Sequence, residues 1–96
     1  MAELLSDTEI DTALSNLPHW SRDGAALTRT VKSPTFPEAI TLVDRVAEVA
    51  ESMNHHPDID IRWRKVTYSL STHSLGGITK FDLELARQID ELAEST

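Results

Sequence analysis

Hydrophobic residues recur at three- and four-residue intervals in three parts of the chain, the spacing of amphipathic helices. The first run follows Ser-Asp-Thr-Glu at positions 6–9, which has the form of a capping box, and stops at Pro18. The second follows Thr-Phe-Pro-Glu at positions 35–38 and should end near Asn54. The third begins at Thr79, and its apolar stripe comprises Ile78, Phe81, Leu85, Ile89 and Leu92. The pattern therefore predicts three helices.

The remaining segments alternate apolar and polar residues with a period of two, as strands do. Positions 25–32 form one such segment after Asp23-Gly24, a turn signal typical of β-hairpins. Farther along, Ile59, Ile61 and Trp63 alternate with charged residues, and positions 66–70 form another alternating run. By this parity Trp63 is expected to pack in the core or at an interface. The pattern predicts two hairpins, the second with one buried face.

The predicted order of elements is helix, two strands, helix, two strands, helix. Antiparallel sheets commonly pack one face on the core, so we expect an α+β fold: a four-stranded antiparallel sheet with three helices on one face, in the order α-β-β-α-β-β-α. Residues 1–96 contain no linker or useful repeat, which indicates a single domain. A chain of 96 residues builds only a modest core. We therefore expect a homo-oligomer.

Composition narrows the classes of function. The chain has 9 basic and 16 acidic residues and a formal net charge of −7, which opposes binding to nucleic acid and to anionic lipid. It has no cysteine, which excludes thiolate chemistry and suits a reducing compartment. Neither a secretory signal pattern nor a bilayer-spanning apolar run is present in the sequence. We expect a cytoplasmic protein with no nucleic-acid or membrane partner.

Three of the four histidines fall at predicted boundaries between elements. His55 and His56 lie where the long central helix meets a strand, and His73 lies where the last strand meets Gly76-Gly77. The strand alternation places His73 off the apolar face, where a ligand can reach it. Histidine exchanges protons near neutral pH, so these side chains suit acid–base catalysis without a metal or nucleophile. The residue types alone leave a second interpretation open, in which the histidines are solvated or only cap helix ends.

The spacing of these histidines resembles the signature of the pterin-4a-carbinolamine dehydratase family. The resemblance extends to Leu-Pro-His-Trp at positions 17–20 and to Leu-Ser-Thr-His at positions 70–73, and the order of elements agrees over essentially the whole chain. The residues that match the signature are Glu51, His55, His56, Pro57, Trp63, His73 and Asp82. The resemblance implies a hydro-lyase, 4a-hydroxytetrahydrobiopterin dehydratase, that converts pterin-4a-carbinolamine to quinonoid dihydropterin in tetrahydrobiopterin recycling.

The same resemblance implies the partners. The family uses no cofactor or metal, binds a pterin substrate and assembles into homodimers or homotetramers. Some animal members also serve as dimerisation cofactors of a transcription factor through a helix surface, and a dehydratase-like chain can be recruited as an assembly chaperone. A protein-binding role through a helix surface is therefore the alternative function. Leu83 falls off the apolar stripe of the last helix, as an apolar residue in a subunit contact would.

Roles within the site also follow from the resemblance. Loss of the 4a-hydroxyl needs one acid and one base, and His55 and His73 are the candidates, with the two roles undivided between them. His56 mainly holds the pterin. The residues expected to bind substrate are Asn54, His55, His56, Ser71, Thr72, His73 and Ser74.

Four further residues are expected to support the site: Glu51, Pro57, Asp82 and Trp20. Glu51 can orient a neighbouring imidazole, although a plain surface role fits it equally. Asp82 is expected to act first as a residue of a helix start. Trp20, beside a turn, fits either a lid or the core. His19 lies outside the signature and is expected to be structural or solvated.

Two other kinds of site fit the sequence less well. Adjacent histidines on an extended segment point to opposite sides, and H-x-x-x-H and H-x-H spacings are absent, which disfavours a metal site on the three histidines with Asp58 or Asp60. A nucleophilic hydrolase would need a G-x-S-x-G elbow, which the sequence lacks. Acid–base catalysis by histidine is the leading hypothesis.

Overall fold

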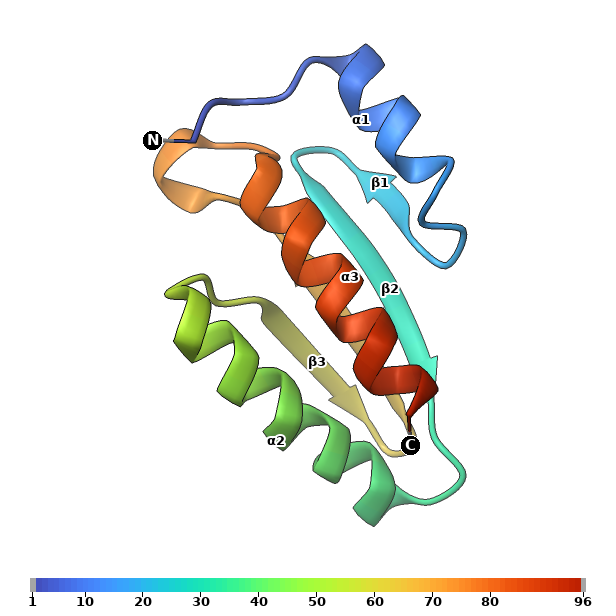
Figure 1. Cartoon of the computed structure of the whole chain (residues 1–96). Coiled ribbons are helices and arrows are strands. Elements are labelled where there is room, and N and C mark those ends of the chain that lie inside the picture. The colour runs from blue at the N-terminus through green and yellow to red at the C-terminus, as the bar shows by residue number, and fades with distance from the viewer. Residues whose placement is uncertain (1, 96) are drawn as a thin grey trace.

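The computed structural model describes residues 2–95, and Figure 1 shows the arrangement of their elements. The elements in chain order are α1 (Asp7–Leu14), β1 (Ser21–Asp23), β2 (Ala26–Lys32), α2 (Phe36–Met53), β3 (Asp58–Arg62), β4 (Lys65–Leu70), the 3-10 turn η1 (His73–Leu75) and α3 (Lys80–Glu94). The predicted α-β-β-α-β-β-α order is confirmed, and η1 is added between β4 and α3.

The four strands form one antiparallel sheet in the order β1-β2-β4-β3. The helices α2 and α3 pack against each other over one face of this sheet, with α3 in front of β4 (Figure 1). α1 is held near β1 by an ion pair between Asp7 and Arg22, whose Oδ1 and Nη1 atoms are 2.7 Å apart. The predicted α+β fold is confirmed.

Local sequence signals set the ends of the helices. At α1, Ser6 Oγ accepts a hydrogen bond from the Glu9 backbone N–H, and the Glu9 carboxylate accepts one from the Ser6 N–H, which completes the predicted capping box. At α2, Thr35 Oγ1 accepts from the Glu38 N–H. α2 ends at Asn54, whose φ of 50° is left-handed, a conformation that asparagine tolerates better than most residues. This turn directs the chain into the His-His pair.

The core lies between the sheet and the helices. The inward-facing residues of β4, Val66, Tyr68 and Leu70, are all buried, as the alternation predicts. The other face of the sheet carries polar pairs such as Thr30 and Thr67, whose hydroxyl oxygens are 2.7 Å apart. The buried apolar residues of α2 and α3 are Ala39, Leu42, Val46, Ala50, Leu83, Leu85, Ala86 and Ile89.

Trp63 is not a core residue, so of the two places expected for it the core is wrong and the interface stays a prediction. β3 ends at Arg62, and Trp63 occupies the turn before β4 with a left-handed φ of 57°. It is 69% exposed, and the Arg64 guanidinium carbon lies 4.6 Å from its ring centroid. The chain reverses at this residue, and Ile61, which has the same parity in β3, is itself 44% exposed.

Two apolar residues of α3 differ from the prediction. Phe81, expected on the buried stripe, is 39% exposed. Leu83, expected off the stripe, is 9% exposed and belongs to the core cluster, because α1 and the N-terminal segment cover that side of α3 through residues such as Leu5 and Ala13. Leu83 is therefore covered within its own chain and does not mark a subunit contact.

Trp20 is held in place by a hydrogen bond to a largely buried ion pair. Arg29 Nη1 donates to Asp90 Oδ1, and Trp20 Nε1 donates to the same oxygen at 2.7 Å. Trp20 is buried, so of its two open interpretations the structure gives the core role. Asp90 lies more than two helical turns beyond Asp82 on α3, which places Trp20 away from the candidate site.

Tyr68 is the one tyrosine in the sequence, and it lies at the centre of the core. Its hydroxyl oxygen is buried and has no hydrogen-bond partner among residues 2–95. Burial raises the pKa of Tyr68 to about 12, although the positive charge of nearby Arg29 acts in the opposite direction. An uncharged phenol in this place is tolerated, but a phenolate would be strongly disfavoured.

Replacement of this phenol, Tyr68→Phe, should remove part of the alkaline destabilisation. Between pH 10 and about 12 the unfolded chain releases the phenolic proton while the folded chain keeps it, so the wild-type free energy of unfolding falls as pH rises through this window. Chemical denaturation at several pH values should show a shallower fall for Tyr68→Phe, and unchanged or greater stability at pH 7 because an unpaired buried hydroxyl is removed. Parallel pH curves for the two proteins would contradict this account.

Candidate active site

His55 is placed by the end of α2. The left-handed Asn54 ends the helix, and the His55 backbone N–H still donates to the carbonyl oxygen of Ala50 at 3.0 Å. His55 Nε2 and Asp82 Oδ1 are 2.6 Å apart, and the His55 side chain is only 12% exposed. A helix end and the start of another helix, far apart in sequence, thus meet through one short polar contact.

Asp82 is fully buried, with 0% exposure, and its second oxygen is also bonded. Asp82 Oδ2 accepts from the Thr79 backbone N–H and from Thr72 Oγ1, each at 2.9 Å. Thr79 in turn caps α3, and its hydroxyl oxygen lies 2.8 Å from that of Thr72. The predicted helix-start role of Asp82 is confirmed, and the same carboxylate also contacts His55.

The hydrogen bonds around Asp82 bear on the tautomer of His55. An ionised carboxylate only accepts hydrogen bonds, so we expect the hydrogen of a neutral His55 ring to lie on Nε2, in the contact with Asp82. The other ring nitrogen, Nδ1, is then the one that can exchange a proton with a ligand. A carboxylate behind an imidazole fixes its tautomer and orientation, as in catalytic triads.

The loop that bears His73 is anchored at Thr72. The Thr72 N–H donates to the Gly77 carbonyl at 2.8 Å, and the Thr72 carbonyl accepts from Leu75 and Gly76. Gly76 closes η1 with a left-handed φ of 70°, which favours glycine. Because the side chain of Thr72 binds Asp82, the backbone next to His73 is tied to the carboxylate that holds His55.

His73 lies in η1 rather than in the strand, since β4 ends at Leu70. Its side chain is 69% exposed, as expected for a residue that a ligand can reach. His73 Nε2 and Asp58 Oδ2 are 3.9 Å apart, which is beyond hydrogen-bonding distance. Asp58 pairs with Ser69 in the register of β3 and β4, so this end of the sheet also brings His73 close to the strand that follows His56.

His56 is held by the last turn of α2. His56 Nε2 and Glu51 Oε1 are 2.7 Å apart, and both side chains are more than half exposed. Glu51 therefore contacts an imidazole, and that imidazole is His56. Both His56 and His73 face solvent, whereas His55 is mostly enclosed.

The other predicted site residues occupy different places. Asn54 and Ser74 are exposed, and Pro57 is half-buried beside His56. Ser71 Oγ donates to the Ala25 carbonyl at 2.8 Å and so ties the strand end to the β1–β2 turn. Thr72 is buried, and its hydroxyl is engaged by Asp82 and Thr79.

Sequence reasoning missed three residues at this site. Thr79 and Asp58 were considered only as a helix cap and as a disfavoured metal ligand, and Phe81 only as a core residue. The ring centroids of Phe81 and His55 are 5.8 Å apart. The position of Phe81 next to the capping Asp82 was a signal that it lies at the exposed first turn of α3.

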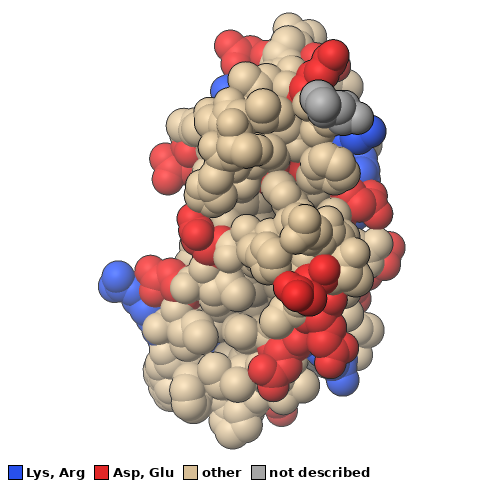
Figure 2. Space-filling model, turned by 90° about the vertical axis from the view of Figure 1, so that its left-hand side faces the viewer, with Lys and Arg blue, Asp and Glu red and all other residues tan. Residues whose placement is uncertain are grey.

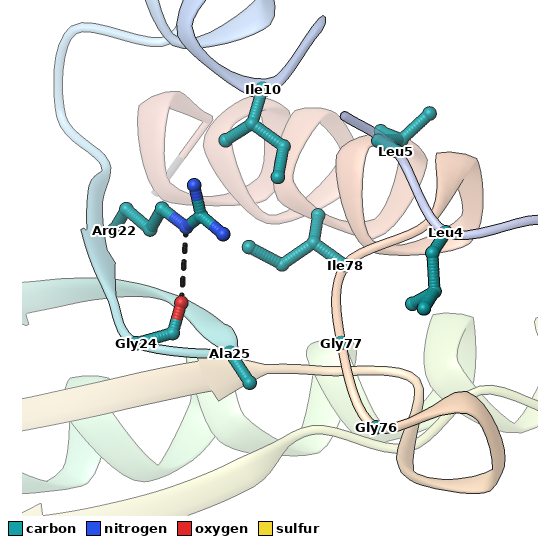
Figure 3. A pocket seen from close by; sticks show the side chains of 9 residues that line it. All are labelled: Leu4, Leu5, Ile10, Arg22, Gly24, Ala25, Gly76, Gly77 and Ile78. Carbon is teal, nitrogen blue, oxygen red and sulfur yellow. Dashed lines mark hydrogen bonds between the residues drawn. The ribbon is translucent and has the colours of Figure 1, made fainter. Parts of the chain in front are cut away.

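A hollow of about 280 Å³ lies near this loop but does not include the histidines. It is bounded by the N-terminal segment, the β1–β2 turn and Gly76-Gly77 (Figure 3). The Arg22 side chain reaches into it, donating from Nε to the Gly24 carbonyl at 3.0 Å. The candidate site is thus a surface around the three histidines, separate from this hollow.

The surface of the molecule carries more acidic than basic side chains on one face (Figure 2). Acidic side chains predominate on the face in Figure 2, and basic ones are few and scattered there. Within residues 2–95, no group of three or more His, Cys, Asp or Glu side chains is placed to hold a metal ion. None of the helices in that part of the chain is long and apolar enough to cross a membrane.

The fold and the site together define a class of protein: an α+β domain with three histidines on the connections at one edge of the sheet, two of which contact a carboxylate. Sequence comparison gives the family. The model of the family "Pterin 4 alpha carbinolamine dehydratase" matches residues 3–92. The chain belongs to the pterin-4a-carbinolamine dehydratase family, as the resemblance predicted.

Two bacterial relatives match nearly the whole chain. A protein of Nocardia farcinica is 66% identical over 95% of this chain and 96% of its own, and one of Roseiflexus castenholzii is 55% identical over 96% and 99%. Both carry the provisional name pterin-4-alpha-carbinolamine dehydratase.

Solved structures agree with the fold. A crystal structure of a transcriptional coactivator/pterin dehydratase from Brucella melitensis superposes with a TM-score of 0.92 at 31% identity, covering 95% of this chain and 99% of the other. A pterin dehydratase-like protein identified as a RuBisCO assembly factor in the alpha-carboxysome superposes with a TM-score of 0.64 at 20% identity, over 80% and 89% of the two chains. The second likeness shows the fold alone.

Loss of the Thr72 hydroxyl should reveal its contribution to the buried network. Thr72→Val keeps the shape but leaves Asp82 Oδ2 with one donor fewer, so the free energy of unfolding should fall by about 1–3 kcal/mol. Thr30→Val is the matched control, because Thr30 belongs to an exposed threonine pair, and it should change stability by no more than about 0.5 kcal/mol. Urea unfolding measures both. Equal effects of the two substitutions would contradict the assigned role of Thr72.

Proposed function

We propose that this chain dehydrates 4a-hydroxytetrahydrobiopterin to quinonoid dihydropterin by histidine acid–base catalysis. The observation that carries the proposal is the contact between His55 and the fully buried Asp82, with His56 and His73 held nearby. Membership of the pterin-4a-carbinolamine dehydratase family supports the choice of substrate.

The reaction needs two proton transfers. The bond between C4a and the hydroxyl oxygen breaks, and an acid protonates that oxygen so that it leaves as water. A base removes the proton on the neighbouring ring nitrogen, and the electron pair freed there forms the new carbon–nitrogen double bond. Water and quinonoid dihydropterin are the products, and no oxidant or reductant is consumed.

We assign the base to His55. With its Nε2–H directed at Asp82, the neutral ring presents the lone pair of Nδ1 as the proton acceptor. After proton uptake, the negative charge of Asp82 offsets the positive charge of the ring. Asp82 is the positioning residue for this step, and Thr72 and Thr79 hold Asp82 in place.

We assign the acid to His73. It is exposed, and the 3.9 Å separation from Asp58 leaves its ring free of a strong hydrogen bond to a carboxylate. His56, steadied by Glu51, then serves to hold the pterin. Asn54, Ser71 and Ser74 supply polar groups for the edges of a heterocycle rich in donors and acceptors. Thr72 is assigned to Asp82 rather than to substrate.

The biological setting forms part of the same proposal. The proposed activity acts in tetrahydrobiopterin recycling in the cytoplasm, and a chain without cysteine suits that reducing compartment. Assembly into a homodimer or homotetramer follows from the family resemblance and from the modest core of a 96-residue chain.

Removal of either proposed acid–base group should slow dehydration. His55→Ala and His73→Ala should each lower the rate by about 10²-fold or more, the usual scale for loss of such a group, with the fold retained. The measurement is the ultraviolet absorbance change as purified protein acts on chemically generated 4a-hydroxytetrahydrobiopterin.

His19→Ala is the matched control, because His19 is an exposed histidine outside the site, and it should retain the wild-type rate. If folded wild-type protein fails to accelerate the reaction, the proposed function is wrong. If His56→Ala alone abolishes turnover while the other two variants keep it, the assigned roles are wrong.

A further inference from the structure

Phe81 contacts the candidate base from the first turn of α3. Its ring centroid lies 5.8 Å from that of His55, and the two ring planes are inclined by 41°. This distance falls in the range at which aromatic side chains attract each other. Phe81 directly precedes Asp82, so adjacent residues of one helical turn contact the same imidazole.

The backbone at Phe81 is fixed by the same network. The Phe81 N–H donates to Thr79 Oγ1 at 3.2 Å, and Thr79 Oγ1 lies 2.8 Å from Thr72 Oγ1. The ring is also ordered from outside, because Lys80 Nζ lies 5.7 Å from its centroid. Phe81 is thus part of a constrained helix start.

Asp82 and Phe81 constrain His55 in different ways. The hydrogen bond to Asp82 fixes the Nε2 edge of the imidazole, but a single bond still permits the ring to rock about that contact. An aromatic ring packed beside the imidazole restricts this motion and so fixes the direction of Nδ1. Small misplacements of a reacting group lower rates steeply.

The exposure of Phe81 also needs an explanation. Helical spacing predicts that it joins the buried stripe, yet 39% of it is exposed, while Leu85 and Ile89 of the same stripe are fully buried. The packing of the core therefore does not account for this aromatic side chain. Its contact with His55 does.

We propose that Phe81 is a positioning residue that holds the His55 imidazole in the orientation in which Nδ1 meets the substrate. This inference rests on the proposed dehydratase function. The apolar ring acts through His55 and exchanges no proton itself.

Two variants separate the ring from its apolar character. Phe81→Leu keeps an apolar side chain but loses the flat ring, and kcat should fall on the order of 10-fold. KM should change by less than about twofold, because an orientation effect on the base acts mainly on the chemical step. Phe81→Tyr keeps the ring and should restore most of kcat.

Phe36→Leu is the matched control. Phe36 is 45% exposed at the first turn of α2, a setting like that of Phe81 but at the opposite end of α2 from His55. This variant should retain wild-type kcat and KM, and circular dichroism should show that all three variants are folded.

A spectroscopic readout tests the contact independently of activity. In proton–carbon NMR spectra, loss of the Phe81 ring current in Phe81→Leu should move the His55 Hε1 resonance while the His19 resonance stays in place. Phe36→Leu should move neither resonance.

The outcomes distinguish a failure of the proposed dehydratase function from a failure of the inference about Phe81. An inactive wild-type protein would overturn the proposed function, and the NMR comparison would still decide whether Phe81 orders His55. An unmoved His55 resonance in Phe81→Leu would overturn the inference about Phe81. So would an active wild-type protein whose kcat is unchanged by Phe81→Leu.

Discussion

The arrangement of the site depends on one fully buried carboxylate. Burial of a charge is costly unless it is bonded on all sides, and Asp82 has 0% exposure. Its Oδ2 accepts hydrogen bonds from Thr72 and from the Thr79 backbone N–H, and its Oδ1 lies 2.6 Å from His55 Nε2. These three partners come from the end of α2, the loop after β4 and the start of α3. Satisfaction of the carboxylate therefore fixes three segments relative to one another.

The sheet supplies the frame in which those segments meet. β3 follows the His-His pair and β4 precedes His73, and the two strands are antiparallel neighbours. The start of β3 therefore lies beside the end of β4, so His56 and His73 flank the same edge of the molecule. α3 packs against α2 over the same face of the sheet, and this packing brings Asp82 next to His55. A small fold thus combines rigid strands with histidines on short connections, a common arrangement for functional residues.

Much of this could be predicted from the sequence, because the governing signals are local. Several local signals predict the order of elements, and the structure has that order: the capping box at positions 6–9, the helix-start residues Thr35 and Thr79, the Asp23-Gly24 turn and the change from helical to strand periodicity at Asp58. The helix-start role of Asp82 was also a local signal. Its contact with His55 was not, because nothing in local spacing shows which helix end a capping carboxylate will face.

The sequence-based predictions that differ from the structure share one physical origin. Trp63 fits the strand alternation, but the chain turns at that residue, and parity does not show where a strand ends. Helical spacing places Phe81 on the buried stripe of α3 and Leu83 off it, which assumes that only one side of this helix is covered. In the structure α1 covers a second side, and Leu83 is buried there. Local spacing also does not show that Thr72, between Ser71 and His73, faces inward toward a buried carboxylate. Each of these features is a tertiary contact, which periodicity does not contain.

The most direct test of the central claim is the tautomer of His55. In nitrogen-15 NMR spectra recorded at a pH where the imidazole is neutral, the account predicts that the hydrogen resides on Nε2, hydrogen-bonded to Asp82, and that Nδ1 is unprotonated. A neutral His55 with its hydrogen on Nδ1, or a ring that averages between the two tautomers, would contradict the account.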